Sequence, residues 1–232
     1  KGDGRRAREK QISVLTGRPS RSWARGKPAS TLVTPEVVTA DMLQDGAILF
    51  VRHSERPSFA GLTNQQKHEV ALTARGREMA RELGQRVRQA ARLASSPVPR
   101  ALETAESIAA GAGLDPGSIL RIPHLMQFLA TGPEHYDEVK RRLGWTGLMA
   151  SWMDGSLPHG VLVPCEQVAR QALEAVLGAP GTRGVIAVTH DFLVMALLAA
   201  LRGERPTSIP YLAGLLVSRK EAERFLGSEV LA

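Results

Sequence analysis

Disulfides and long hydrophobic runs are missing from this sequence. Its 232 residues include one cysteine, Cys165, which excludes an intrachain disulfide and cannot form a zinc site without histidine or carboxylate ligands. The longest apolar run, residues 192–201, has ten residues, about half the length that a membrane-spanning helix needs. These absences exclude a disulfide-stabilised scaffold and a membrane protein, so we expect a soluble, cytoplasmic protein with no membrane partner.

The body of the chain also lacks a net charge. Residues 1–30 hold nine basic and two acidic residues, whereas the other 202 residues hold 21 of each, so the net charge of +7 belongs to the N-terminal segment. That segment has no apolar periodicity, which predicts disorder, and it also fits an arginine-rich organelle transit peptide. Nucleic-acid-binding domains carry a basic face, so we expect nucleic acid to bind at most weakly, through this segment.

Strand-like and helix-like patterns alternate from residue 41 onward. Continuous apolar runs predict buried strands at 47–51 and 185–189, and further short strands are expected at 92–96, 119–122 and 212–218. Helical periodicity predicts a helix that Thr73 can cap, and further helices starting at Pro99, Pro164 and Asp191. This alternation predicts an N-terminal segment, residues 1–40, followed by one α/β domain, residues 41–232, folded as a three-layer α/β/α sandwich around a mostly parallel sheet.

Segment 123–163 interrupts this alternation. It is rich in proline, glycine, histidine and tryptophan, so we expect an irregular cap inserted into the domain. Its aromatic residues are assigned to packing, although they could instead shape a substrate-binding cap: Phe128, Tyr136, Trp145 and Trp152.

Arginine, histidine and aspartate side chains follow three of the predicted strands: Arg52 and His53, Arg100, and His190 with Asp191. Ligands of an open α/β sheet bind beyond the carboxyl ends of its strands, so these side chains are expected to meet there. Each has a structural interpretation when taken alone; Asp191, for example, suits the N-cap of the following helix. The coincidence of all three strand ends favours a chemical role.

Such a set of side chains suits phosphoryl transfer through a phosphohistidine. A phosphomonoester spreads negative charge over three oxygens, which guanidinium groups bind in a bidentate manner. A neutral imidazole is nucleophilic at pH 7 when a hydrogen bond fixes its other nitrogen. A second histidine can donate to the phosphate oxygens, while a carboxylic acid protonates the leaving alkoxide and later activates water.

The sequence resembles the histidine phosphatase (phosphoglycerate mutase-like) superfamily. The matching motifs occur in the family's order: Val51-Arg52-His53-Ser54, Leu72-Thr73-Ala74-Arg75-Gly76, Ser95-Ser96-Pro97-Val98-Pro99-Arg100 with Glu103-Thr104-Ala105, and Val188-Thr189-His190-Asp191. The resemblance implies that His53 is the phosphorylated nucleophile. It also implies that Arg52, Arg100 and His190 line the phosphate pocket.

Two features resemble the acid-phosphatase branch of that superfamily more closely. Arg56 stands where that branch has a second arginine, which implies a further phosphate contact. The pair His190-Asp191 resembles its His-Asp motif, which implies that Asp191 is the proton donor. Glu134 and Glu138 are the alternative acids, because the glutamate motif of the mutase-like branch is not found.

Ser54 departs from the family pattern, which has glycine after the nucleophilic histidine. Its hydroxyl lies beside the expected phosphate, so we expect a contact with substrate. The remaining histidines show no paired metal-ligand spacing, and we therefore predict no metal and no cofactor: His68, His124, His135 and His159.

These observations predict a metal-independent phosphatase that hydrolyses a small phosphomonoester through a phosphohistidine. One alternative is a phosphomutase of the same fold, against which the missing glutamate motif argues. The other is a non-catalytic protein that binds a phosphorylated ligand. The sequence names neither the substrate nor the oligomeric state.

Overall fold

The computed structural model describes residues 31–88, 91–126, 133–179 and 184–227. The disorder expected for residues 1–30 lies outside these ranges. Residues 31–40 were assigned to the N-terminal segment, but they contain the short strand β1 (Leu32–Val33) and the start of a 3-10 helix at Ala40. This part packs on the folded body because β1 pairs with the last strand of the sheet. The division at residue 40 otherwise stays a prediction.

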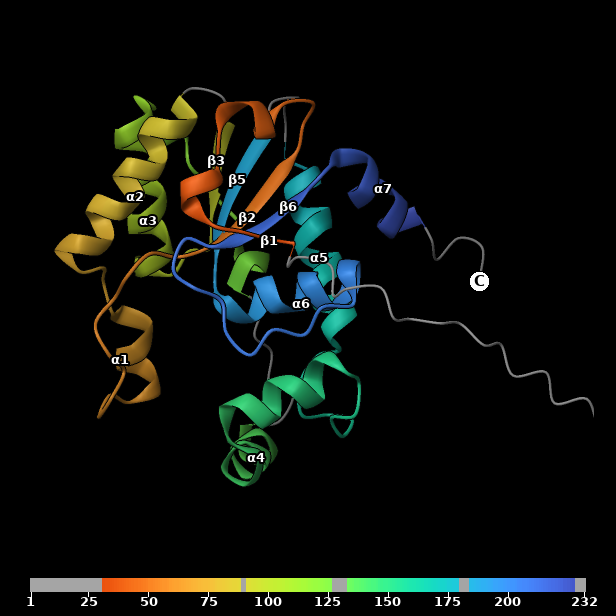
Figure 1. Cartoon of the computed structure of the whole chain (residues 1–232). Coiled ribbons are helices and arrows are strands. Elements are labelled where there is room, and N and C mark those ends of the chain that lie inside the picture. Colours follow the sequence, from red (N-terminus) through yellow and green to blue (C-terminus); the bar gives the residue numbers. More distant parts are fainter. Residues whose placement is uncertain (1–30, 89–90, 127–132, 180–183, 228–232) are drawn as a thin grey trace, which may run out of the picture.

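A six-stranded sheet, mixed but mostly parallel, forms the central layer (Figure 1). Its strand order is β1-β6-β2-β5-β3-β4. The bounds are β2 Ile48–Arg52, β3 Ala91–Ser95, β4 Leu120–Arg121, β5 Gly184–Thr189 and β6 Gly214–Val217. Strands β2, β5, β3 and β4 run parallel, whereas β6 is antiparallel to both β2 and β1. The predicted α/β fold with a mostly parallel sheet is confirmed.

Seven α-helices surround this sheet within the described ranges. Their bounds are α1 Asn64–Glu69, α2 Ala74–Val87, α3 Pro99–Ala112, α4 Pro133–Met153, α5 Cys165–Leu177, α6 Asp191–Arg202 and α7 Arg219–Gly227. Helices α2 and α3 cover one face of the sheet, and α5, α6 and α7 lie on the other (Figure 1). None of the helices described is long and apolar enough to cross a membrane.

Side chains of β2 point alternately to the two faces of the sheet and pack against the helices on each face. Leu49 and Val51 pack in a buried cluster with side chains of α2 and α3. Ile48 and Phe50 point to the other face and pack with side chains of α5 and α6. A strand buried on both faces needs apolar residues at every position, which is why its sequence is a continuous apolar run.

Segment 123–163 is more regular than expected. It holds helix α4, which continues through a break at Gly144, where φ is 66° and ψ is 176°. The glycine adopts a left-handed φ that other residues rarely tolerate, and this break hides the helical periodicity in the sequence. Helix α4 lies beyond the carboxyl ends of the parallel strands (Figure 1). Its role as a cap stays a prediction.

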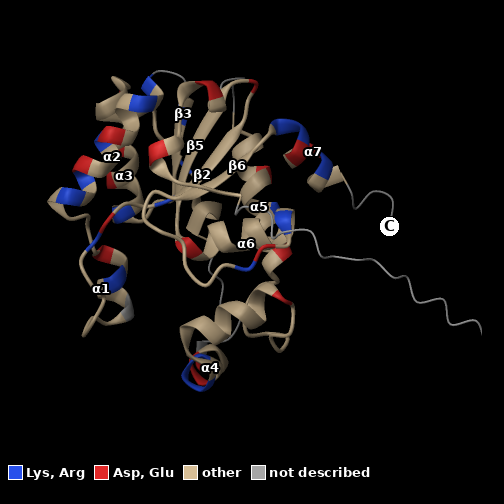
Figure 2. Ribbon diagram, in the orientation of Figure 1, with Lys and Arg blue, Asp and Glu red and all other residues tan. Residues whose placement is uncertain are grey.

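The outer helices carry basic and acidic residues side by side (Figure 2). On α2, for example, Arg81 pairs with Glu78 at 2.6 Å. On α7, Arg219 pairs with Glu223 at 2.8 Å. This interspersion agrees with the neutral balance of the chain after residue 30.

Candidate active site

Strand register brings the predicted site residues to one edge of the sheet. Arg52, the last residue of β2, is level with Thr189 of β5, and Ser95 of β3 is level with Val188. The pairing extends one residue further, because His53 N–H donates to the Thr189 carbonyl at 2.8 Å. His53 and His190 therefore leave adjacent strands together, and their ring centroids are 5.4 Å apart.

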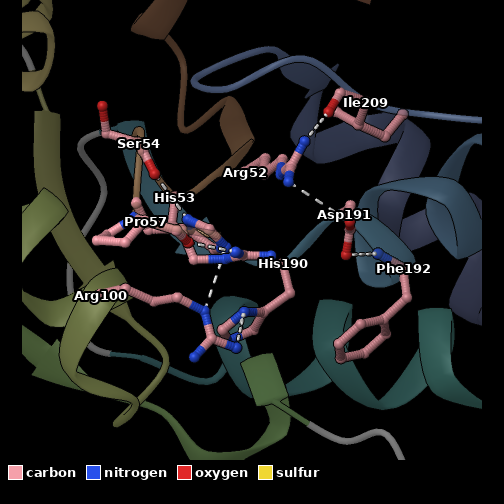
Figure 3. Close-up of polar contacts among 10 residues, drawn as sticks. Arg52, His53, Ser54, Pro57, Arg100, His190, Asp191, Phe192 and Ile209 are labelled. Carbon is pink, nitrogen blue, oxygen red and sulfur yellow. Dashed lines mark hydrogen bonds and ion pairs between the residues drawn. The ribbon is translucent and has the colours of Figure 1, made fainter. Parts of the chain in front are cut away.

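A cavity of about 470 Å³ opens at this edge. Five predicted site residues line it, namely His53, Arg56, Arg100, His190 and Asp191, together with Phe59, Lys67, Met126, Lys140, Trp145 and Phe192. Figure 3 shows the two histidine rings, Arg100 and Asp191 gathered at this place. The expected convergence of the three strand ends is thus confirmed.

His53 is buried, with 3% of its surface exposed, and the hydrogen bonds fix its tautomer. Its Nδ1 lies 2.8 Å from the Ser54 carbonyl, which can only accept, so Nδ1 carries the proton. Its Nε2 is therefore unprotonated and accepts from Arg100 Nε at 3.2 Å. Burial, followed by the nearby arginines, lowers the pKa of His53 to about 3. The ring is therefore a neutral imidazole with an unprotonated Nε2, on a residue that lines the cavity.

His190 continues the same chain of hydrogen bonds. Its Nδ1 accepts from Arg100 Nη2 at 3.3 Å, which leaves Nε2–H to donate to Ser96 Oγ at 3.0 Å. Burial, and then Arg100, lower the pKa of His190 well below the ordinary value of histidine. The ring stacks parallel to Phe192 at 5.7 Å, so its orientation is fixed from two sides.

Arg100 joins the two histidines and is itself largely buried. Its Nη1 donates to the Lys67 carbonyl at 3.0 Å, so all three nitrogens of the guanidinium have partners. Burial lowers the pKa of Arg100 to about 10, which keeps it protonated at neutral pH. It therefore supplies a positive charge next to the unprotonated Nε2 of His53.

The other two arginines are held against aromatic rings. Arg52 donates to the Ile209 carbonyl, and its guanidinium carbon lies 4.3 Å from the ring centroid of Tyr211. Arg56 lies 3.2 Å from the ring centroid of Phe59. Such contacts orient a guanidinium without neutralising it. Arg56 lines the cavity, whereas Arg52 is not among the residues that line it and lies within ion-pair distance of Asp191.

Asp191 is the first residue of α6, not its N-cap as its sequence position suggested; the cap residue is His190. One carboxylate oxygen accepts from Phe192 N–H at 2.9 Å, and the other lies 3.7 Å from Arg52 Nη2. Asp191 lines the cavity, whereas the alternative acids Glu134 and Glu138 are exposed and do not.

Ser54 contributes to the site through its backbone. Its carbonyl accepts from His53 Nδ1, and its N–H donates to Thr104 Oγ1 at 3.0 Å. The side-chain hydroxyl is fully buried and has no hydrogen-bond partner among the described residues. Ser54 is not among the residues that line the cavity, and the expected contact of its hydroxyl with substrate stays a prediction.

The remaining motif residues support the loop that follows His53. Thr73 caps α2 by accepting from Gly76 N–H at 2.9 Å, while its own N–H donates to the Glu55 carbonyl at 3.1 Å. A Cβ on Gly76 would lie 2.2 Å from the same carbonyl, so only glycine fits there. The motif around Thr73 therefore fixes the backbone of the loop that follows His53.

Two residues beside the histidines, Ser96 and Tyr211, were not predicted from the sequence, and neither is among the residues that line the cavity. Ser96 stands within a recognised motif, which could have drawn attention to it. Tyr211, whose ring centroid is 6.0 Å from that of His53, comes from the loop before β6 and has no local signal. No group of three or more histidine, cysteine, aspartate or glutamate side chains that could hold a metal occurs in the part of the chain that the structure describes.

Comparisons with solved structures show that the fold is shared with phosphatases and with a mutase. A mycobacterial glucosyl-3-phosphoglycerate phosphatase is 22% identical, with 72% of this chain and 87% of that chain covered, at a TM-score of 0.50. Phosphoglycerate mutase from Bacillus anthracis is 16% identical over 78% and 96% of the two chains, at a TM-score of 0.50. YhfR from Bacillus stearothermophilus is 22% identical over 75% and 95%, also at 0.50. The search of curated proteins found no match.

A family profile identifies the family and corrects one expectation. The profile that matches residues 48–223 is that of the histidine phosphatase superfamily, branch 1. The expected closeness to the acid-phosphatase branch, inferred from Arg56 and the pair His190-Asp191, is therefore wrong. The matched range spans three quarters of the sequence and includes every predicted site residue. The chain belongs to branch 1 of the histidine phosphatase superfamily.

Proposed function

We propose that this chain is a phosphatase that hydrolyses a small phosphomonoester through a phosphohistidine on His53. The observation that carries the proposal is the state of the His53 ring. Its Nδ1–H is fixed by the Ser54 carbonyl, and its unprotonated Nε2 lies beside the positive charge of Arg100. A nucleophile next to an anion-binding guanidinium is the arrangement that phosphoryl transfer requires.

The first step forms the phosphoenzyme. The substrate phosphate takes the place of the His53–Arg100 hydrogen bond, and the guanidiniums of Arg52, Arg56 and Arg100 bind its oxygens. The lone pair of His53 Nε2 attacks phosphorus, and the bond to the leaving oxygen breaks. Asp191, as a carboxylic acid, gives its proton to that oxygen, so the product leaves as a neutral alcohol.

The second step releases phosphate. The Asp191 carboxylate takes a proton from water, and the resulting hydroxide attacks phosphorus as the P–N bond breaks. The bond electrons return to His53 Nε2, which restores the neutral ring. Throughout, the Ser54 carbonyl stabilises the positive charge that develops on the imidazole, through the hydrogen bond to Nδ1.

Hydrolysis of p-nitrophenyl phosphate in the presence of a metal chelator tests this proposal. We expect wild-type turnover without added metal and a loss of at least about 10³-fold in His53→Ala, because the nucleophile is removed. His159→Ala, which changes an exposed histidine away from the cavity, is the matched control. An acid-labile phosphoenzyme should form on brief mixing with wild type and be missing in His53→Ala.

Three results would contradict the proposal. His53→Ala with near wild-type turnover would exclude the phosphohistidine. Tight binding of phosphate to wild type without turnover would indicate a non-catalytic binding protein. Transfer of the phosphoryl group to an added alcohol, in preference to water, would indicate a phosphomutase.

A further inference from the structure

The cavity is larger than a phosphate group requires. At about 470 Å³ it falls within the range of pockets that enclose a whole small ligand. The histidines and Arg100 occupy the sheet edge, whereas Lys140 and Trp145 reach the cavity from α4. The α4 side of the cavity therefore faces the part of a substrate that leaves with the oxygen.

Positive charge exceeds negative charge around this space. Among the described residues, four basic ones line the cavity, namely Arg56, Lys67, Arg100 and Lys140, against one acidic residue, Asp191. That carboxylate already faces Arg52 at 3.7 Å. A single phosphate dianion bound at the sheet edge leaves the charge of Lys140 uncompensated.

The ammonium group of Lys140 lies near two aromatic rings. Its ammonium lies 5.3 Å from the ring centroid of Tyr136 and 5.9 Å from that of Trp145. No carboxylate lies within ion-pair distance of it in the described ranges. Lys67, by contrast, belongs to the phosphate end, because its carbonyl accepts from Arg100.

Trp145 offers an exposed aromatic surface beside this ammonium. The side chain follows the break in α4 at Gly144, and 36% of its surface is exposed, whereas Phe192, which also lines the cavity, is buried. An indole at the wall of a ligand-sized cavity can stack on a planar ring, which would remove apolar surface from water.

We propose that the substrate is an aromatic phosphomonoester whose ring carries a second anionic group. The ring stacks on Trp145 and the second anion pairs with Lys140, while the phosphate is held at the sheet edge. This assignment names the substrate class and rests on the proposed function, which it extends.

Two matched pairs of non-hydrolysable phosphonates test the proposal by titration calorimetry. The first pair is 4-(phosphonomethyl)benzoate and its methyl ester, which differ in one negative charge. We expect wild type to bind the carboxylate more tightly, and Lys140→Met to reduce that preference about tenfold, as for loss of a charged contact. Arg141→Met removes the same charge from an exposed site on α4 and should keep the wild-type preference.

The second pair is benzylphosphonate and butylphosphonate, which differ in the aromatic ring. Trp145→Leu should reduce the preference for the benzyl compound by about fivefold, the size of an aromatic contact. An unchanged preference in Trp145→Leu would overturn the stacking, and an unchanged preference in Lys140→Met, or an equal fall in Arg141→Met, would overturn the anion site.

These measurements separate the two proposals. Binding that depends on Lys140, in a protein that hydrolyses neither 4-carboxyphenyl phosphate nor p-nitrophenyl phosphate, would refute the phosphatase and support the anion site. Hydrolysis of both esters, without any binding preference that depends on Lys140, would support the phosphatase and refute the anion site.

Discussion

Arg100 Nε donates to His53 Nε2 at 3.2 Å, so a guanidinium is hydrogen-bonded to the atom that we propose as the nucleophile. The bond holds the imidazole lone pair toward the cavity and prevents its protonation from that side. In the proposed mechanism an incoming phosphate replaces this hydrogen bond by offering oxygens to the same guanidinium. Binding of the anion would then free the lone pair of His53 Nε2 in the same step.

The first prediction concerns the proton donor. Asp191→Asn should slow hydrolysis of alkyl phosphates about 10²-fold or more, because a poor leaving group needs a proton. The same change should affect p-nitrophenyl phosphate much less, because nitrophenolate leaves without one. Turnover of both esters by wild type and variant measures this difference. Glu134→Gln and Glu138→Gln are the controls; if either reproduces the pattern and Asp191→Asn does not, Asp191 is not the acid.

The second prediction concerns the pH dependence of stability. Burial lowers the pKa of His53 to about 3 and lowers that of His190 well below 6.5, its ordinary value. Below pH 6.5 the unfolded chain binds protons that the folded chain does not, so the free energy of unfolding falls as the pH falls. Between pH 7.5 and 5.5 each buried histidine should lower the free energy of unfolding by about 1 kcal/mol.

Urea unfolding at these two pH values tests the second prediction. The loss of stability on acidification should be smaller by that amount in His190→Asn, and likewise in His53→Asn, than in wild type. His135→Asn changes an exposed histidine and should lose as much stability as wild type. An equal loss in wild type and in both buried-site variants would show that the two rings are not held neutral.

Sequence reasoning predicted the parts of the fold that depend on local patterns. The runs that became β2 and β5 are apolar at almost every position because both of their faces are covered. Thr73 was predicted to cap a helix and does so through its side chain. In contrast, β1 has only two residues, and it is a strand because β6 is there to pair with it.

The site residues that directly follow a strand could be predicted from the sequence, whereas those contributed by other segments were missed. His53 and His190 stand directly after buried strands, whereas Lys140 reaches the cavity from α4 and Tyr211 lies beside His53 from a loop. The assignment to the acid-phosphatase branch is wrong because a pair of adjacent residues, His190 and Asp191, is too short a motif to distinguish the branches. The profile over residues 48–223 has far more positions to compare.

The third prediction concerns the buried hydroxyl of Ser54. Ser54→Ala should raise the free energy of unfolding by about 1 kcal/mol, because it removes a buried polar atom without a partner in the described ranges. Thr104→Val keeps the shape but removes the acceptor of Ser54 N–H, and should lower stability by about 2 kcal/mol. Urea unfolding of both variants measures these opposite signs. A loss of stability in Ser54→Ala would show that the hydroxyl has a partner.

The last prediction concerns the contact between α2 and the loop that follows the nucleophile. Helix propensity alone predicts that Gly76→Ala stabilises the protein by about 1 kcal/mol. The added Cβ, however, would lie 2.2 Å from the Glu55 carbonyl, so α2 or the loop after His53 must move. We therefore expect a loss of at least about 2 kcal/mol, typical of overpacking, and lower turnover of p-nitrophenyl phosphate.

Gly147→Ala is the matched control for this last change, because its Cβ would meet only the Leu143 side chain, at 3.3 Å. At this position no backbone clash opposes the higher helix propensity of alanine. The midpoint of urea unfolding should therefore stay at or above that of wild type. The two substitutions add the same methyl group within a helix. If Gly76→Ala lowers the stability and Gly147→Ala does not, the destabilisation by Gly76→Ala arises from the contact with Glu55. Equal, stabilising effects would instead mean that the loop beside the nucleophile does not depend on this close approach.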